Sequence, residues 1–421
     1  MDPELDQEPS ASRLVQAFKK TFLSLRNRNF RLYFAGQLVS NTGNWLTNVA
    51  LTLLVLKLTR SGFAVGLLAA FSYGPILFLS AWGGAIADRV DKRRFLFLTQ
   101  GLEMVESAGL AVLAFMPHPP LAGLYGLALC GGIFLAFDNP LRRSFVNEMV
   151  PKADVPNAVI LYSTIVNTSR IFGPALAGLL VVTVGYGWCF AIDALSYVAV
   201  IFSLYRMRPA ELHCEPLQPR AKGEIRAGLR YVAATPMLWI SFAMLASIGT
   251  LAYNFNVTLP LFVTDTMHRS ASVFTILYSV FSCGAVVSAL FIAQRGLVRM
   301  RHIIIGAAAL GCAMLLLATT TKLATAAPVI FFVGVASILY TTATTTMVQV
   351  EAEASVRGRV LALQMVLLAG TTPIGGPILG WLADTLGGRA PIVLGGVACL
   401  VTAVFGWFAS RRYIEPAVAS T

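Results

Sequence analysis

Long apolar segments recur from one end of the chain to the other, and they constrain the fold more than any other feature. Each is about 18 to 25 residues long, enough for an α-helix to cross a hydrocarbon core of about 30 Å. Only 12% of the 421 residues are charged and 57% are hydrophobic, a balance that a water-soluble domain does not tolerate. We therefore predict an all-α, polytopic membrane protein.

Twelve transmembrane helices are predicted from these segments. They cover residues 30-56, 62-87, 95-116, 121-139, 157-183, 188-205, 237-263, 271-293, 302-319, 326-348, 360-383 and 391-408. The sequence before the first helix has no signal-peptide cleavage site, so residues 1-29 are expected to form a cytoplasmic tail. The remaining predicted regions are an N-terminal six-helix bundle at 30-205, a cytoplasmic linker at 206-236, a C-terminal six-helix bundle at 237-408 and a cytoplasmic tail at 409-421.

The positions of the basic residues explain the net charge of +12. Of the 32 Lys and Arg residues, 26 fall on the side of the termini, five on the other side, and Arg170 lies inside a predicted helix. This asymmetry places both termini in the cytoplasm of a cell with an inner membrane. A nucleic-acid partner is not needed to account for the charge. The six cysteines show no metal-ligand spacing, so neither disulfides nor a bound metal are expected.

The two halves of the chain resemble each other. "RSGFAVGLLAAFSYG" at Arg60 is similar to "RSASVFTILYSVFSCG" at Arg269, and "GPALAGLLVVTVG" at Gly173 is similar to "GPILGWLADTLGG" at Gly376. Parallel six-helix repeats with a site between them at the membrane midplane are the arrangement of a rocking carrier. The linker segment "EIRAGLRYVAATP" is interpreted either as a short helix on the inner membrane face or as a solvated tether.

The stretch "GGAIADRVDKRRF" after the second predicted helix resembles the signature of the major facilitator superfamily. The resemblance implies a cytoplasmic gate, in which Gly84 permits close helix packing and Asp88 pairs with Arg142 and with the start of the eleventh helix. Arg89 belongs to the motif, and Asp138 is expected beside Arg142 and Arg143. The alternative is that the basic cluster only sets the topology.

A second stretch, "FDNPLRRSFVNEMVPKADVPNAVILYSTIVNTSRIFGPALAGLL", is similar to the drug and siderophore exporter branch, which includes enterobactin and macrolide exporters. Within it, Gly173, Pro174 and Gly178 resemble an antiporter motif, and Gly376 and Pro377 repeat it in the second half. The resemblance implies antiport. Small residues and proline would allow close packing and bending as the bundles rock, although a packing kink alone is the alternative.

Polar side chains form a stripe on the first predicted helix. Gln37, Asn41, Asn44 and Asn48 are spaced by three or four residues and therefore share one face. Because polar groups are costly in lipid, this face lines a central cavity or makes interhelical hydrogen bonds. The substrate-cavity candidates are these four residues together with Asn167, Tyr253, Asn254 and Asn256.

Four charged residues inside the predicted helices are proton-coupling candidates: Glu103, Glu106, Arg170 and Asp193. Glu103 and Glu106 lie one turn apart near mid-membrane, where two adjacent carboxylates should not both be ionised. One of them would hold a proton, unless both are structural. Arg170 cannot lose its proton and therefore needs an anion or other acceptors nearby. The alternatives are a glutamate of the third predicted helix, exchanged as protons arrive, an anionic cargo, and a fixed ion-pair partner.

Together these features predict a proton-coupled exporter of small molecules such as drugs or siderophores, working by alternating access. The lipid bilayer, a small-molecule substrate and protons are the expected partners, and a monomer is the default. An importer or lipid facilitator of the same fold remains an alternative, as does a nontransporting membrane sensor. No phosphate-binding loop or catalytic motif is present, so neither a cofactor nor enzymatic activity is expected.

Overall fold

The computed structural model describes residues 22–87, 89–213, 224–293, 300–353 and 356–418. Every long element in these ranges is a helix. The bilayer requires each spanning segment to satisfy its own backbone hydrogen bonds, and an α-helix does so. The predicted all-α fold is confirmed.

The first half of the chain forms one helical bundle. Its helices are α2 (Arg28–Thr59), α3 (Gly62–Ala87), α4 (Lys92–Phe115), α5 (Leu121–Glu148), α6 (Val155–Thr183) and α7 (Tyr186–Arg206), with the short 3-10 turns η1 (Leu23–Arg26), η2 (Lys152–Asp154) and η3 (Pro209–Glu211). The turn η1 is docked, because the Ser24 amide donates to Asn157 Oδ1 at 3.0 Å. Residues 23–26, which were predicted to be part of the cytoplasmic tail, therefore pack against α6.

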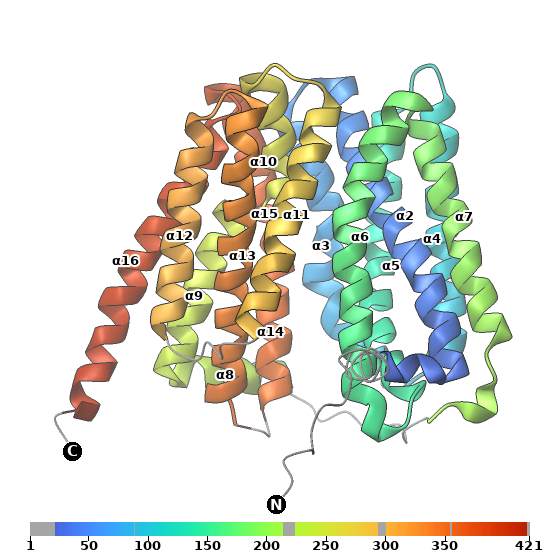
Figure 1. Ribbon diagram of the computed structural model, residues 1–421, viewed down its shortest axis with the longest axis horizontal. Coiled ribbons are helices and arrows are strands. Elements are labelled where there is room, and N and C mark those ends of the chain that lie inside the picture. Colours follow the sequence, from blue (N-terminus) through green and yellow to red (C-terminus); the bar gives the residue numbers. More distant parts are fainter. Residues whose placement is uncertain (1–21, 88, 214–223, 294–299, 354–355, 419–421) are drawn as a thin grey trace, which may run out of the picture.

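The second half forms a matching bundle. Its helices are α8 (Glu224–Ala234), α9 (Pro236–Leu251), α10 (Phe255–Leu261), the π-helical turn η4 (Phe262–Thr266), α11 (Ala271–Ala293), α12 (Met300–Thr319), α13 (Leu323–Glu351), α14 (Arg357–Gly370), α15 (Thr372–Leu386) and α16 (Ala390–Val418). Figure 1 shows the bundles side by side, with the start of α2 and the end of α16 at the same end of the molecule.

Eleven segments in the described ranges are long and apolar enough to cross a membrane. The 32-residue helix α2 is the twelfth crossing, and it packs against α6 and α7. Its hydropathy is lower because Asn41, Asn44 and Asn48 interrupt the apolar sequence. With α2 counted, the described ranges contain the twelve predicted spans. The helix that is less apolar than the other eleven is the one that carries the polar stripe.

Two predicted helices are broken. The seventh, predicted as continuous over 237-263, stops at Leu251 and resumes at Phe255. Asn254 Nδ2 donates to the Thr250 carbonyl at 2.7 Å, which satisfies a backbone group freed by the break. The eleventh, predicted over 360-383, is divided at Thr371, just before Pro373, which has no N–H to donate.

The bundles meet at the end opposite to the start of α2. There α3 packs against α15, and α6 against α11. Glycines make this approach possible: a Cβ atom on Gly66 would overlap the Gly376 backbone, and one on Gly178 would overlap the Thr275 side chain. Toward the other end, the ribbons of the two bundles lie farther apart (Figure 1).

Candidate functional site

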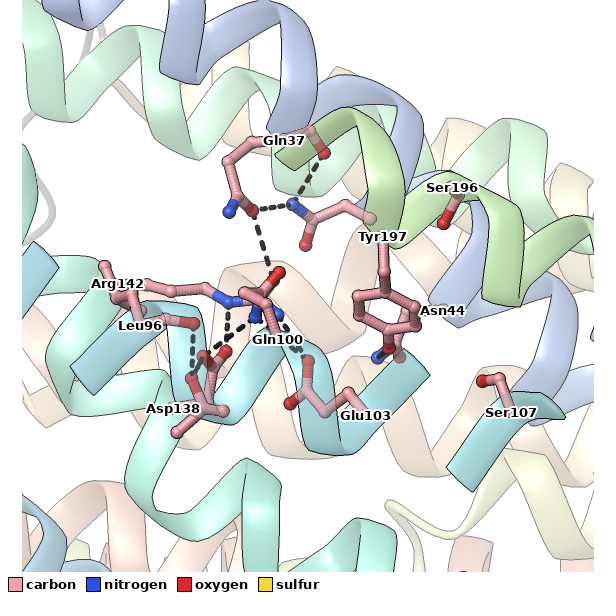
Figure 2. Close-up of polar contacts among 12 residues, drawn as sticks. Gln37, Asn44, Leu96, Gln100, Glu103, Ser107, Asp138, Arg142, Ser196 and Tyr197 are labelled. Atoms are coloured by element: carbon pink, nitrogen blue, oxygen red, sulfur yellow. Dashed lines mark hydrogen bonds and ion pairs between the residues drawn. The ribbon is translucent and has the colours of Figure 1, made fainter. Parts of the chain in front are cut away.

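A buried charge cluster lies between α4 and α5. Arg142 of α5 forms ion pairs with Asp138, one turn earlier, and with Glu103 of α4, whose Oε2 is 2.9 Å from Nη2. The third guanidinium contact is Gln37 Oε1 of α2, at 3.1 Å. Asp138 and Gln37 are fully buried, and Glu103 is 3% exposed. Figure 2 shows these side chains pointing toward one another from three helices.

Neutral donors hold the two carboxylates in place. Gln100 Nε2 lies between them, 2.9 Å from Asp138 Oδ1 and 3.1 Å from Glu103 Oε2 (Figure 2). The Thr99 hydroxyl donates to the same Asp138 oxygen at 2.7 Å. These contacts fix the two carboxylate side chains near the middle of α4. One oxygen, Glu103 Oε1, is buried without a hydrogen-bond partner in the described part of the chain.

A second carboxylate site lies farther along the same bundle. Asp193 of α7 is 1% exposed and accepts hydrogen bonds from Thr47 and Ser107, each at 2.7 Å, and from Ser196 at 3.3 Å. Glu106 is half-buried and packs against Gly131 of α5. The interior of this bundle therefore contains four carboxylates, and Arg142 is the basic residue paired with them in the described ranges.

The predicted cytoplasmic gate involves Asp88, which lies outside the described residues. Its expected pairing with Arg142 and with the start of the eleventh helix therefore stays a prediction. In the described residues, the Arg142 guanidinium pairs with carboxylates of its own bundle. Among the described residues, Gly84 has no neighbour that an added Cβ would meet, whereas Gly83 packs closely against Ala136 of α5. Arg89 is exposed. A close helix approach is therefore observed at Gly83, and the predicted role of Gly84 stays a prediction.

The substrate-cavity candidates separate into three groups. Asn48 and Asn256 line a cavity of 30 Å³ between the bundles, where Asn48 donates to the Tyr73 hydroxyl at 3.1 Å. Asn167 is exposed. The others are engaged in contacts within one bundle: Gln37 and Asn41 with each other, Asn44 with Tyr197, Tyr253 with Ser337, and Asn254 with its own helix. Gln37 and Asn254 are buried, and cavity lining by these residues stays a prediction.

One interpretation paired Arg170 of α6 with a glutamate of the third predicted helix, which is α4 in the structure. There, Glu103 of α4 pairs with Arg142 instead. The Arg170 guanidinium lies 5.9 Å from the centre of the Trp45 ring and 5.6 Å from that of Phe281. Its Nε is buried without a hydrogen-bond partner among the residues that the structure describes. The ring contacts come from both bundles, because Trp45 belongs to α2 and Phe281 to α11.

The residues of the antiporter-like motif form close contacts. Gly173 packs against Trp45 within the first bundle, and Gly178 against α11 of the second. Gly376 packs against Gly66 of α3. Pro174 and Pro377 lie inside α6 and α15. Both copies of the motif therefore contribute to the end where the bundles meet.

A comparison with known protein families identifies the family of this chain. The family described as transmembrane secretion effector matches residues 19–420, nearly the whole sequence. The chain belongs to this transmembrane secretion effector family. The predicted major facilitator fold and multi-pass membrane character are thereby confirmed.

Curated relatives of this chain include siderophore carriers. The staphyloferrin A transporter of Staphylococcus aureus is 31% identical over 176 residues, 41% of this chain and 44% of the relative. The enterobactin exporter EntS of Shigella boydii is 25% identical over 261 residues, 62% of each chain. The matches thus span less than two thirds of these relatives' lengths.

Solved structures share the fold of the secretion effector. A bacterial homologue of the human lysosomal transporter Spinster, in an inward-facing and unoccupied conformation, has a TM-score of 0.73 and 15% identity, and covers 92% of this chain and 98% of its own. The peptide transporter PepTSo has a TM-score of 0.74 and 12% identity, with coverage of 92% and 98%. At these identities the comparison concerns the fold.

One residue at the contact between the bundles was missed from the sequence. Asp384, at the end of α15, accepts hydrogen bonds from the Ser61 hydroxyl at 2.7 Å and from the Gly62 and Phe63 amides at 2.5 and 3.0 Å. It therefore caps the start of α3 from the opposite bundle. A signal was present, because Gly380-x-x-Ala-Asp384 repeats Gly84-x-x-Ala-Asp88 of the gate motif.

Proposed function

We propose that this protein is a proton-coupled exporter of small, siderophore-like molecules that works by alternating access. It would act as a monomer in the inner cell membrane, with both termini in the cytoplasm. The names of the relatives support the cargo class, and the basic loops support the orientation. The observation that carries proton coupling is the buried charge imbalance of the first bundle.

That imbalance is greatest at Arg142, where one guanidinium faces the carboxyl groups of Asp138 and Glu103. Burying an ionised group costs several kcal/mol unless it is paired. Two ionised carboxylates would leave one negative charge without a counter-ion, so the cluster favours holding one proton. Asp193 and Glu106 add two more acids without a basic partner in the described ranges.

Alternating access would use this proton as follows. In the present arrangement the bundles are closed at the Asp384 end, and cargo would enter between them from the cytoplasm. When the bundles rock, the carboxylates exchange their proton with the other side of the membrane. The cost of leaving the acid cluster doubly ionised would couple the two events.

Proteoliposomes with an imposed pH gradient test this proposal. Efflux of a cationic dye, a macrolide and a catecholate siderophore would be measured with the wild type and with Glu103→Gln. The substitution leaves one carboxylate for one guanidinium, so we expect the fold to be kept. We expect gradient-driven efflux to fall about tenfold or more, as for loss of a proton-transfer group. Exchange of labelled cargo without a gradient should continue.

The matched control is Glu211→Gln, because Glu211 pairs with Arg208 at the protein surface and should leave efflux unchanged. Asp138→Asn is the second test of the cluster. If both cluster variants retain gradient-driven efflux, the proton site lies elsewhere. Wild-type movement that ignores the gradient would instead indicate a facilitator.

A further inference from the structure

An apolar groove runs along the outside of the molecule where α3 packs against α15. Its volume is about 360 Å³, within the range of about 300–1,000 Å³ that is typical of sites for small molecules. Four side chains line it, one from the first bundle and three from the second: Phe63, Pro377, Ile378 and Trp381. Phe63, Ile378 and Trp381 are between 44% and 56% exposed, so the groove is accessible from outside the protein.

The groove depends on close contact between the two bundles. At the crossing of α3 and α15 the backbones touch, because a Cβ atom on Gly62 would come within 2.6 Å of the Gly380 carbonyl oxygen. Large side chains have no room in the crossing itself, and Phe63 and Trp381 border it, one from each helix. The groove therefore has both of its walls only while the bundles are in contact at this end.

The groove lies in the membrane, near one of its surfaces. Both α3 and the segment α14–α15 are apolar enough to cross the bilayer, so their exposed apolar side chains contact hydrocarbon. Phe63 is the second residue of α3, and Trp381 lies within the last two turns of α15. This level is the membrane interface, where tryptophan is common and lipid headgroups begin. A hydrocarbon chain attached to a headgroup is therefore the occupant that fits the groove.

The charges at this end favour a negative headgroup. Arg60 ends α2 and is exposed three residues before Phe63, so their Cα atoms are at most about 11 Å apart. Arg389 is exposed in the turn after α15. Neither arginine forms an ion pair with a described residue. The nearby Asp384 carboxylate already accepts hydrogen bonds from the Ser61 hydroxyl and two amides of α3. Two free guanidinium groups thus exceed one occupied carboxylate, and guanidinium groups bind phosphate well.

We propose that an anionic phospholipid binds here, with one acyl chain in the groove and its phosphate at Arg60. The lipid comes from the membrane leaflet on the Asp384 side. Because the groove needs a wall from each bundle, the lipid binds the arrangement in which α3 and α15 are in contact, and it stabilises that arrangement over one in which they separate. The inference concerns a lipid ligand and depends neither on the cargo nor on proton coupling.

Native mass spectrometry tests this inference without any transport assay. The purified protein in detergent would be titrated with phosphatidylglycerol and with phosphatidylcholine of the same acyl chains, and the affinity for the first bound lipid measured. We expect the wild type to prefer phosphatidylglycerol, whose net charge is negative. In Arg60→Gln the ratio of the two affinities should fall about fivefold, the usual effect of one basic residue on the binding of anionic lipid.

Lys57→Gln is the matched control for the charge. Lys57 is exposed one turn before Arg60, but its ammonium group lies over the Tyr186 ring of α7, 5.2 Å from the ring centre. This variant should keep the wild-type ratio. Equal affinity of the wild type for both lipids would overturn the inference, and so would an equal fall of the ratio in Lys57→Gln and Arg60→Gln.

Ile378→Trp tests the groove itself. The larger side chain should fill the groove and weaken the binding of both lipids, with little change in their ratio. The control is Ile305→Trp, since Ile305 is 55% exposed on α12 and does not line the groove. If the two tryptophan variants bound lipid equally well, the acyl chain would not lie in the groove and the inference would be wrong.

Discussion

Gly43 shows at the scale of one residue how tightly α2 packs against α7, the helix that carries the buried carboxylate of Asp193. A Cβ atom at this position would overlap the carboxylate of Asp193 and approach Ser196 Oγ to 2.7 Å. Gly43→Ala should therefore push α2 from α7 and disturb the hydrogen bonds of Asp193. We expect destabilisation of about 1–3 kcal/mol, typical of overpacking, seen as a lower unfolding temperature in detergent.

Gly101 of α4 provides the matched comparison for that substitution. It has no neighbour that an added Cβ would meet, and it lies in the same bundle. Gly101→Ala should leave the unfolding temperature unchanged or raise it slightly, because alanine favours helix. If both alanine variants unfolded at the same temperature, packing at Gly43 would not be limiting.

At the scale of single residues, the sequence indicated which charged groups lie inside the bundle, but not how they pair. The cost of charge in lipid selected Glu103 and Asp193, and both are buried. Asp138 was expected beside Arg142 in the gate region, and the two form an ion pair. The link from Arg142 to Glu103 and Gln37 joins three helices, and their relative rotation is not encoded in local spacing.

At the scale of elements, the junction of α3 and α15 depends on the cap that Asp384 provides. Loss of a helix cap costs about 1 kcal/mol. Asp384→Ala should therefore lower the equilibrium constant for closure of that end about fivefold. We expect a cysteine placed at Thr275, now 3% exposed, to react faster with a thiol reagent in this variant. The reaction rate in a cysteine-free background measures the effect.

Asp265 is the control for the Asp384 variant. It lies in η4, and its carboxylate accepts a hydrogen bond from the adjacent Thr264. Asp265→Ala should leave the reactivity at Thr275→Cys unchanged. Equal reactivity in the Asp384 variant and the parent would mean that the glycine contacts alone keep this end closed.

Helix number and order followed from hydropathy because the bilayer imposes length and composition together. Helix interruption did not. The apolar sequence continues through Ala252 and Thr371, so hydropathy gave no sign of either break. Their positions depend on Asn254 and on Pro373, single residues that supply or remove one backbone hydrogen bond. The internal repeat indicated two bundles. The contacts between the bundles, such as that of Gly66 with Gly376, could be identified only from the three-dimensional structure.

For the whole molecule, the open end should be detectable from one side of the membrane. Asn167 is exposed on α6. If cargo enters between the bundles from the cytoplasm, a membrane-impermeant thiol reagent should label Asn167→Cys, in a cysteine-free background, in inside-out vesicles and hardly in intact cells. Arg60→Cys, exposed at the opposite end, should show the reverse. Labelling of Asn167→Cys from outside alone would contradict both the orientation and the open end.

The linker between the bundles is anchored at both ends. The His213 amide donates to the Glu148 carbonyl of the first bundle at 2.7 Å, and the Tyr231 hydroxyl of α8 donates to the Glu351 carbonyl of the second at 3.3 Å. Between His213 and the start of α8 the chain can span at most about 40 Å when fully extended. This length is an upper limit on the distance between the two anchored ends. It limits how far the bundles can separate there, so shortening the linker should restrict the size of cargo admitted before it affects the end where α3 packs against α15.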